Sequence, residues 1–188
     1  MRHSIALACL GLVLAPAALA QDLGSAFDEV RIGVAAHDVY GGFLPVNSSQ
    51  WTIEAPEDVA FEVLFRSPDI EAFQWIGAPR PNIGGTVSTT GRESLLHAGL
   101  TWQVPVFETP LYLEATFGAA IHNGALTGAT DPGRNLGCRV NFYEALGVGA
   151  NLSDEWTLTV SYEHTSNANL CEENDGLSNL GVKLGYKF

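Results

Sequence analysis

A histidine and a serine near the carboxyl end of the chain have the spacing of a base and a nucleophile. His164 and Ser166 are separated by a single residue, Thr165, within the stretch Tyr-Glu-His-Thr-Ser-Asn at 162–167. On a β-strand, such residues share a face and lie roughly 7 Å apart, so an imidazole that leans along the strand reaches the hydroxyl. A serine needs this help because its hydroxyl alone is a weak nucleophile. Spacing alone also allows a simpler interpretation, in which the pair is the polar edge of an apolar strand.

The segment around this pair alternates in polarity with the period of a β-strand. Its apolar face contains Trp156, Leu158, Val160 and Tyr162, and the same parity brings His164 and Ser166 onto that face, pointing outward. The same pattern recurs along the chain, which predicts an all-β fold of eight strands. These strands are expected at about 29–37, 59–66, 79–88, 94–104, 111–122, 138–150, 155–166 and 177–188.

The faces opposite the apolar ones contain charged residues of both signs. They include Arg31, Glu62, Arg66, Arg80, His97, Glu114, Arg139, Glu163, Lys183 and Lys187. A soluble ligand-carrying barrel would turn these residues toward water, whereas a membrane barrel would pair them inside its lumen. Alternation alone does not decide between the two arrangements.

Three features favour an eight-stranded antiparallel transmembrane β-barrel. The apolar row from Leu111 to Ile121 is unbroken, as a tilted spanning strand of roughly 9 to 11 residues requires. Aromatic residues mark strand ends, and the chain stops on Gly-Tyr-Lys-Phe at 185–188, which resembles the terminal strand of bacterial outer-membrane barrels. Closing the sheet leaves no unpaired edge in lipid. We expect the connections near 39–58, 89–93, 123–137 and 167–176 to face outside, and those near 67–78, 105–110 and 151–154 to face the periplasm.

The first residues predict export. Arg2 and His3 precede an apolar run from Ile5 to Leu14, and Ala-Leu-Ala at 18–20 has the small residues that a signal peptidase needs. Residues 1–20 are therefore expected to be a signal peptide and 21–188 the outer-membrane barrel. The alternatives are a membrane anchor and a lipoprotein site at Cys9. The apolar run is shorter than the roughly 20 residues that a spanning helix needs, and only a few apolar residues precede Cys9. Loss of Arg2 would leave 8 Lys+Arg against 21 Asp+Glu, a net charge of −13. Such a charge argues against a nucleic-acid partner, because phosphate binding needs clustered cations.

The last hairpin resembles the carboxyl-terminal signature of the lipid A 3-O-deacylase family. The matching pieces are Tyr-Glu-His-Thr-Ser-Asn-Ala at 162–168, Asn-Asp-Gly at 174–176 and the final strand at 181–188. The resemblance implies an outer-membrane esterase that cleaves a fatty-acyl ester of lipopolysaccharide without metal or cofactor, in contact with outer-membrane lipid. Ser166 would be the nucleophile, His164 the general base, and Asn167 and Asn174 would form or position the oxyanion site.

One position departs from that family. Its catalytic Glu corresponds to Ser178 here, which keeps the outward face but loses the charge that stabilises the imidazolium. Possible substitutes are the loop acids Glu172, Glu173 and Asp175, whereas Glu163 is expected on the opposite face and Glu144 lower on its strand. The alternative is a non-catalytic barrel with a structural or ligand-binding role.

Two cysteines remain after the expected cleavage. Cys138 and Cys171 are both expected at the extracellular end, where an oxidising compartment favours a disulfide over free thiols. Such a bond would tether the last loop over the site. The sequence does not define the acyl chain that is cleaved or the oligomeric state.

Overall fold

The computed structural model describes residues 26–40 and 42–188. The expected signal peptide at 1–20 lies outside this range, so its cleavage stays a prediction. Within the described residues, helices are short, and none has the length and apolar character needed to cross a membrane.

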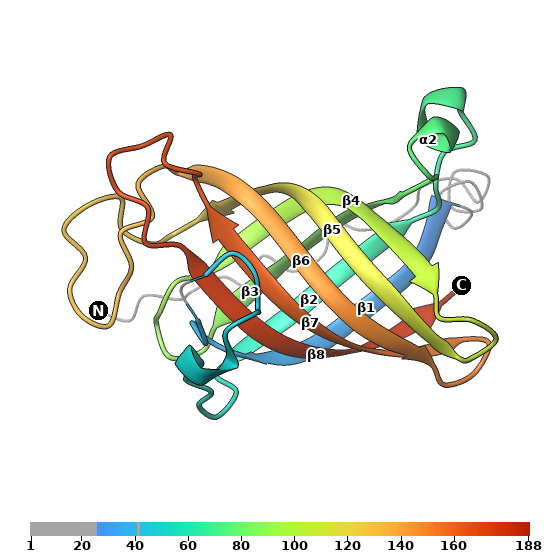
Figure 1. Cartoon of the computed structure of the whole chain (residues 1–188), viewed down its shortest axis with the longest axis horizontal. Helices are drawn as coiled ribbons and strands as arrows, with labels where there is room; N and C mark the ends of the chain where they lie inside the picture. Colours follow the sequence, from blue (N-terminus) through green and yellow to red (C-terminus); the bar gives the residue numbers. More distant parts are fainter. Residues whose placement is uncertain (1–25, 41) are drawn as a thin grey trace, which may run out of the picture.

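Eight antiparallel strands form a closed barrel (Figure 1). Each strand pairs with the next along the chain, and β1 pairs with β8 to complete the ring. The strands are β1 Phe27–Ala36, β2 Asp58–Phe65, β3 Arg80–Ser88, β4 Leu95–Pro105, β5 Leu111–His122, β6 Val140–Asn151, β7 Trp156–Ser166 and β8 Leu177–Lys187. The eight predicted strands are therefore confirmed, with ends displaced by two residues or fewer.

The side chains show which face of the barrel points inward. Apolar residues on the outer face are exposed, such as Ile32 at 64% and Leu113 at 52%. In the lumen, Arg31 forms ion pairs with Glu62 at 3.1 Å and Glu114 at 2.7 Å. This arrangement is that of a membrane barrel, because a soluble carrier would place its apolar face inside.

Not every charge that was expected opposite the apolar face lies in the lumen. Arg66 and Arg139 are exposed, because β2 ends at Phe65 and β6 begins at Val140, so the strand parity does not extend to them. Arg139 instead donates a hydrogen bond to the carbonyl oxygen of His122 at 2.7 Å. The prediction was wrong for these two rim residues.

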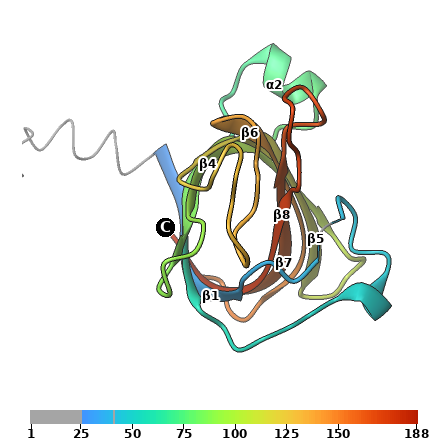
Figure 2. The same cartoon turned by 90° about the vertical axis from the view of Figure 1, so that its left-hand side faces the viewer.

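The connections divide between two rims. One rim contains the β1–β2, β3–β4, β5–β6 and β7–β8 loops, and Figure 2 looks onto it. The opposite rim contains the end of β8 and the β2–β3 connection, in which a short helix, α2 (Glu71–Trp75), is found. The β1–β2 loop includes a 3-10 turn, η1 (Ser48–Gln50), and lies outside the wall beside β7 and β8 (Figures 1 and 2).

Candidate active site

Strand β7 places His164 between two partners on neighbouring strands. In the antiparallel registers, His164 lies directly opposite Ser178 of β8 and opposite Glu144 of β6. The imidazole Nδ1 is 2.7 Å from the Ser178 hydroxyl oxygen, a hydrogen-bonding distance. These residues form a polar row across the outer wall, at positions where the same strands elsewhere present apolar side chains.

The β1–β2 loop is attached to the wall directly over this row. The amide of Val39 donates to the carbonyl oxygen of Ser178 at 2.7 Å, and the amide of Asp38 donates to the side chain of Asn179 at 3.0 Å. As a result, His164 is only 4% exposed and Ser178 is fully buried. These groups point outward as predicted, but a loop covers them, which strand parity does not reveal.

Aromatic contacts hold the loop in place. Trp51 stacks on Tyr162 with ring centroids 5.6 Å apart, and Phe43 meets the edge of the His164 ring at 5.8 Å. The Tyr162 hydroxyl donates to the carbonyl oxygen of Gly42, and the Ser178 hydroxyl lies 3.5 Å from that same oxygen. Because the Ser178 hydroxyl can donate to Gly42 while it accepts from Nδ1–H, this network favours the imidazole tautomer with a free Nε2.

Ser166 occupies the last position of β7, on the same outward face as His164. It is half-buried, opposite Phe142 of β6, and its hydroxyl makes no hydrogen bond within the described residues. The structure therefore shows no His164–Ser166 hydrogen bond. Since Ser178 occupies Nδ1, the nitrogen left to accept a proton from Ser166 is Nε2.

A family model described as lipid A 3-O-deacylase (PagL) matches residues 65–187, which is well over half of the chain. The chain belongs to the lipid A 3-O-deacylase family. Together with the closed barrel, this membership places the protein in the bacterial outer membrane. No curated protein sequence gives a match.

Solved structures share the architecture of this lipid A 3-O-deacylase family member. The crystal structure of the outer membrane enzyme PagL aligns over 85% of this chain and 98% of that chain, with 18% identity and a TM-score of 0.52. Neisserial surface protein A aligns over 86% and 96%, with 12% identity and a TM-score of 0.49. At 18% identity, the likeness to the PagL structure shows the fold alone.

Ser178 occupies the family's acid position, and the two acids on β6 and β7 differ in how they lie relative to His164. Glu163 faces the lumen as predicted, where its carboxylate pairs with Lys183 at 3.0 Å. Glu144, by contrast, was predicted to lie lower on its strand but stands directly opposite His164. The sequence did not reveal this because the β6–β7 register depends on the length of the turn between the strands.

The loop acids take no part in the row. Glu172 and Glu173 are exposed, and Asp175 accepts a hydrogen bond from the amide of Asn135 at 2.7 Å. Among the described residues, neither these three acids nor Glu144 forms an ion pair with His164, but only Glu144 lies at a position directly opposite the imidazole. The structure therefore gives the three loop acids no role beside the imidazole.

The two asparagines expected at the oxyanion site hold the β7–β8 loop together. The side-chain amide of Asn167 donates to the carbonyl oxygens of Leu136 at 2.9 Å and Glu173 at 2.6 Å. The side-chain oxygen of Asn174 accepts from the Asn167 amide at 2.8 Å. Because these donors are already engaged, the geometry supports a positioning role more than direct oxyanion binding.

Cys138 and Cys171 form a disulfide, with their Cα atoms 5.8 Å apart. The bond links the residues just before β6 to the β7–β8 loop, so it tethers that loop beside Ser166. The predicted pairing is therefore present in the structure.

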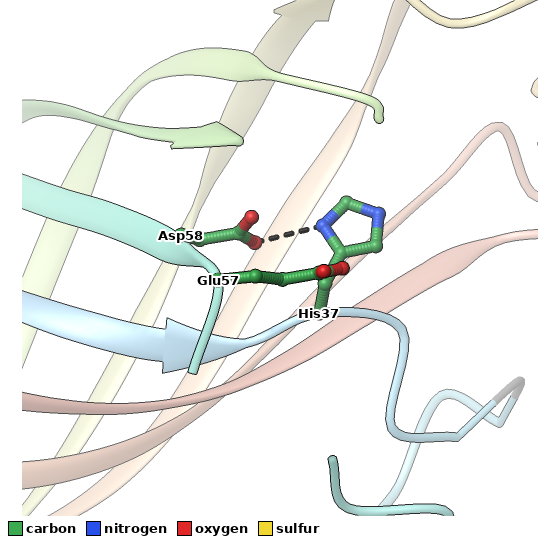
Figure 3. A group of neighbouring side chains, drawn as sticks. All are labelled: His37, Glu57 and Asp58. Carbon is green, nitrogen blue, oxygen red and sulfur yellow. Dashed lines mark hydrogen bonds and ion pairs between the residues drawn. The ribbon is translucent and has the colours of Figure 1, made fainter. Parts of the chain in front are cut away.

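A second cluster of titratable groups lies at the same rim, where β1 ends and β2 begins. His37, Glu57 and Asp58 offer ligand atoms within 4.8 Å of one another (Figure 3). Both nitrogens of His37 already face carboxylates, Asp58 at 2.7 Å and Glu93 at 3.3 Å, and Arg92 lies 3.5 Å from Glu57. These internal ion pairs account for the cluster without a metal ion.

Burial and hydrogen bonding act in opposite directions on this histidine. Burial alone would lower the pKa of His37, but its hydrogen bonds to Asp58 and Glu93 outweigh that effect and raise the pKa to about 9. The imidazolium is therefore a structural cation at neutral pH, and it joins β1, β2 and the β3–β4 loop.

Proposed function

We propose that this protein is an esterase that hydrolyses a fatty-acyl ester of lipid A, with Ser166 as nucleophile and His164 as general base. The observation that carries the proposal is the fixed imidazole, whose Nδ1 is held by Ser178 and whose Nε2 has no hydrogen-bond partner among the described residues. Family membership supports lipopolysaccharide as the substrate class. The outward-facing position of the pair suits an ester that lies in the membrane beside the barrel wall.

The reaction follows from the roles of these two groups. His164 Nε2 takes the proton from Ser166 as the serine oxygen bonds to the ester carbonyl carbon. When the tetrahedral intermediate collapses, the bond to the sugar oxygen breaks and that oxygen takes the proton from the imidazolium. A water molecule then repeats the sequence on the acyl-serine, which frees the fatty acid and restores Ser166.

The serine at position 178 is the observation that favours a second, non-catalytic candidate function. Ser178 orients the ring but brings no negative charge, and it is fully buried beneath the β1–β2 loop. A barrel that had kept the site and lost the reaction would have a structural or ligand-binding role. The two functions differ in whether any fatty acid is released.

Mass spectrometry of lipid A from cells with and without the protein tests the choice. We expect a lipid A species lighter by one hydroxy-fatty acyl group in cells that express the native chain, and none with Ser166→Ala or His164→Ala. Ser161→Ala is the matched control, since Ser161 is on the same strand but faces the lumen, and it should remain active. Release that persists in Ser166→Ala would refute this mechanism, and no release from the native chain would favour the non-catalytic barrel.

A further inference from the structure

Glu144 is a carboxylate in an unusual place. Along β6 its outward-facing neighbours are Phe142 and Leu146, both exposed apolar residues. On the outward faces of β6, β7 and β8, all of which the structure describes, Glu144 is the single acidic residue. An acidic side chain on the lipid side of a barrel is costly, so its presence there calls for a role.

The position of Glu144 relates it to His164. Directly opposed residues of an antiparallel pair have Cβ atoms about 4.5–5.5 Å apart, and these two are opposed across β6 and β7. The Oε2 atom of Glu144 is buried and has no hydrogen-bond partner among the described residues. A cavity of about 150 Å³, lined in part by Phe43, Leu146 and Tyr162, adjoins this carboxylate and leaves it room to turn.

We propose that Glu144 supplies the negative charge that the His164 imidazolium needs, while Ser178 supplies only its orientation. This inference rests on the proposed function of the site. In a serine esterase, one acid performs both tasks, since it fixes the tautomer and stabilises the charged ring. Here the tasks are divided between residues on the two strands that flank β7.

The electrostatics of the covered site support this division. When His164 takes the proton from Ser166, a positive charge forms beneath the β1–β2 loop, where water is scarce and charges interact strongly. Ser178, at 2.7 Å, can accept one hydrogen bond from the ring but carries no charge. Glu144 projects from β6, on the opposite side of β7 from Ser178, so a turn of its side chain toward the ring would balance the charge without displacing Ser178 from Nδ1. Glu144 is thus a positioning residue that acts through His164.

Purified protein in detergent, with lipopolysaccharide as substrate, tests the assignment. Glu144→Gln should lower kcat about ten- to a hundredfold with KM changed less than about twofold, because the charge acts on the transition state rather than on bound substrate. Glu144→Asp should retain most of the rate. Val148→Gln places an amide on the same face two outward positions away and outside that cavity, so it should leave kcat nearly unchanged.

A fluorophosphonate probe gives a second readout that does not depend on the lipid substrate. The rate at which the probe modifies Ser166 reports activation of the nucleophile, so Glu144→Gln should slow labelling by a similar factor. Native rates for Glu144→Gln in both assays, with Ser166→Ala inactive, would overturn the role of Glu144 and leave the proposed function standing. A loss confined to KM, or shared by Val148→Gln, would indicate packing and would also overturn the role of Glu144. If the native chain neither hydrolyses lipopolysaccharide nor reacts with the probe, both proposals are overturned.

Discussion

The lumen and the outward-facing row both contain ionisable groups shielded from water, but they differ in whether each carboxylate has a cationic partner. In the lumen, Arg31 contacts Glu29 at 2.9 Å, Glu62 at 3.1 Å and Glu114 at 2.7 Å, so each carboxylate has a cation. On the outer wall, Glu144 has no cationic partner among the described residues, and it faces an imidazole across the strand pair. The ion pairs of Arg31 in the lumen therefore stabilise the barrel, whereas the Glu144 carboxylate on the outer wall does not.

The physical reason lies in the cost of desolvation. A buried charge is tolerated when several hydrogen-bonded partners replace the water it has lost, as in the lumen network. A buried carboxylate without such partners lowers stability and is therefore a candidate for function. Substitutions in the lumen should thus lower the free energy of unfolding, whereas substitutions in the row should change the reaction rate.

The largest effect on stability is expected from Arg31→Gln. It would remove the cation that Glu29, Glu62 and Glu114 share and leave them only the Arg80 and Lys183 partners, which should cost about 3–5 kcal/mol of unfolding free energy. Urea unfolding in lipid vesicles, followed by tryptophan fluorescence, measures this. Arg66→Gln at the rim is the control and should change stability by about 0.5 kcal/mol or less. Equal losses in the two variants would contradict the distinction between lumen and rim.

The disulfide at the rim should have the next largest effect. Replacing Cys138 and Cys171 together by serine removes a link that spans the β6–β7 hairpin, and we expect a loss of about 2–4 kcal/mol on unfolding. Thiol labelling of the unreduced, denatured native chain should leave both residues unmodified. Labelling of both would show that the bond does not form in the cell.

The His37 cluster should make stability depend on pH. Since the pKa of His37 is raised from 6.5 to about 9, its ion pairs stabilise the fold fully below pH 6.5 and are lost as pH rises toward 9. The loss should reach up to about 3 kcal/mol. Unfolding curves between pH 6 and 10 measure it, and His37→Gln should remove most of this slope. An unchanged slope in the variant would assign the effect to other groups.

The smallest effect on the barrel is expected from Trp51→Ala. It removes the stack on Tyr162, worth about 1 kcal/mol, and loosens the β1–β2 loop without touching the strands. Fluorophosphonate labelling of Ser166 should then be a few-fold faster, while the unfolding midpoint stays nearly constant. Slower labelling would mean that the loop helps to build the site instead of restricting access to it.

The sequence by itself determined the eight strands and the face on which His164, Ser166 and Ser178 stand. Strand alternation is a local property, because successive side chains point to opposite faces wherever the chain is extended. It also indicated the pairing of Cys138 with Cys171, because both lie at strand ends on one rim.

Only the tertiary structure decided what surrounds the histidine. The β6–β7 register sets Glu144 opposite His164, and a shift by one residue would have turned Glu144 into the lumen. The β1–β2 loop, distant in sequence, covers the row through Phe43 and Trp51. Neither feature has a local signature, because both arise from contacts between segments whose sequences are patterned independently of one another.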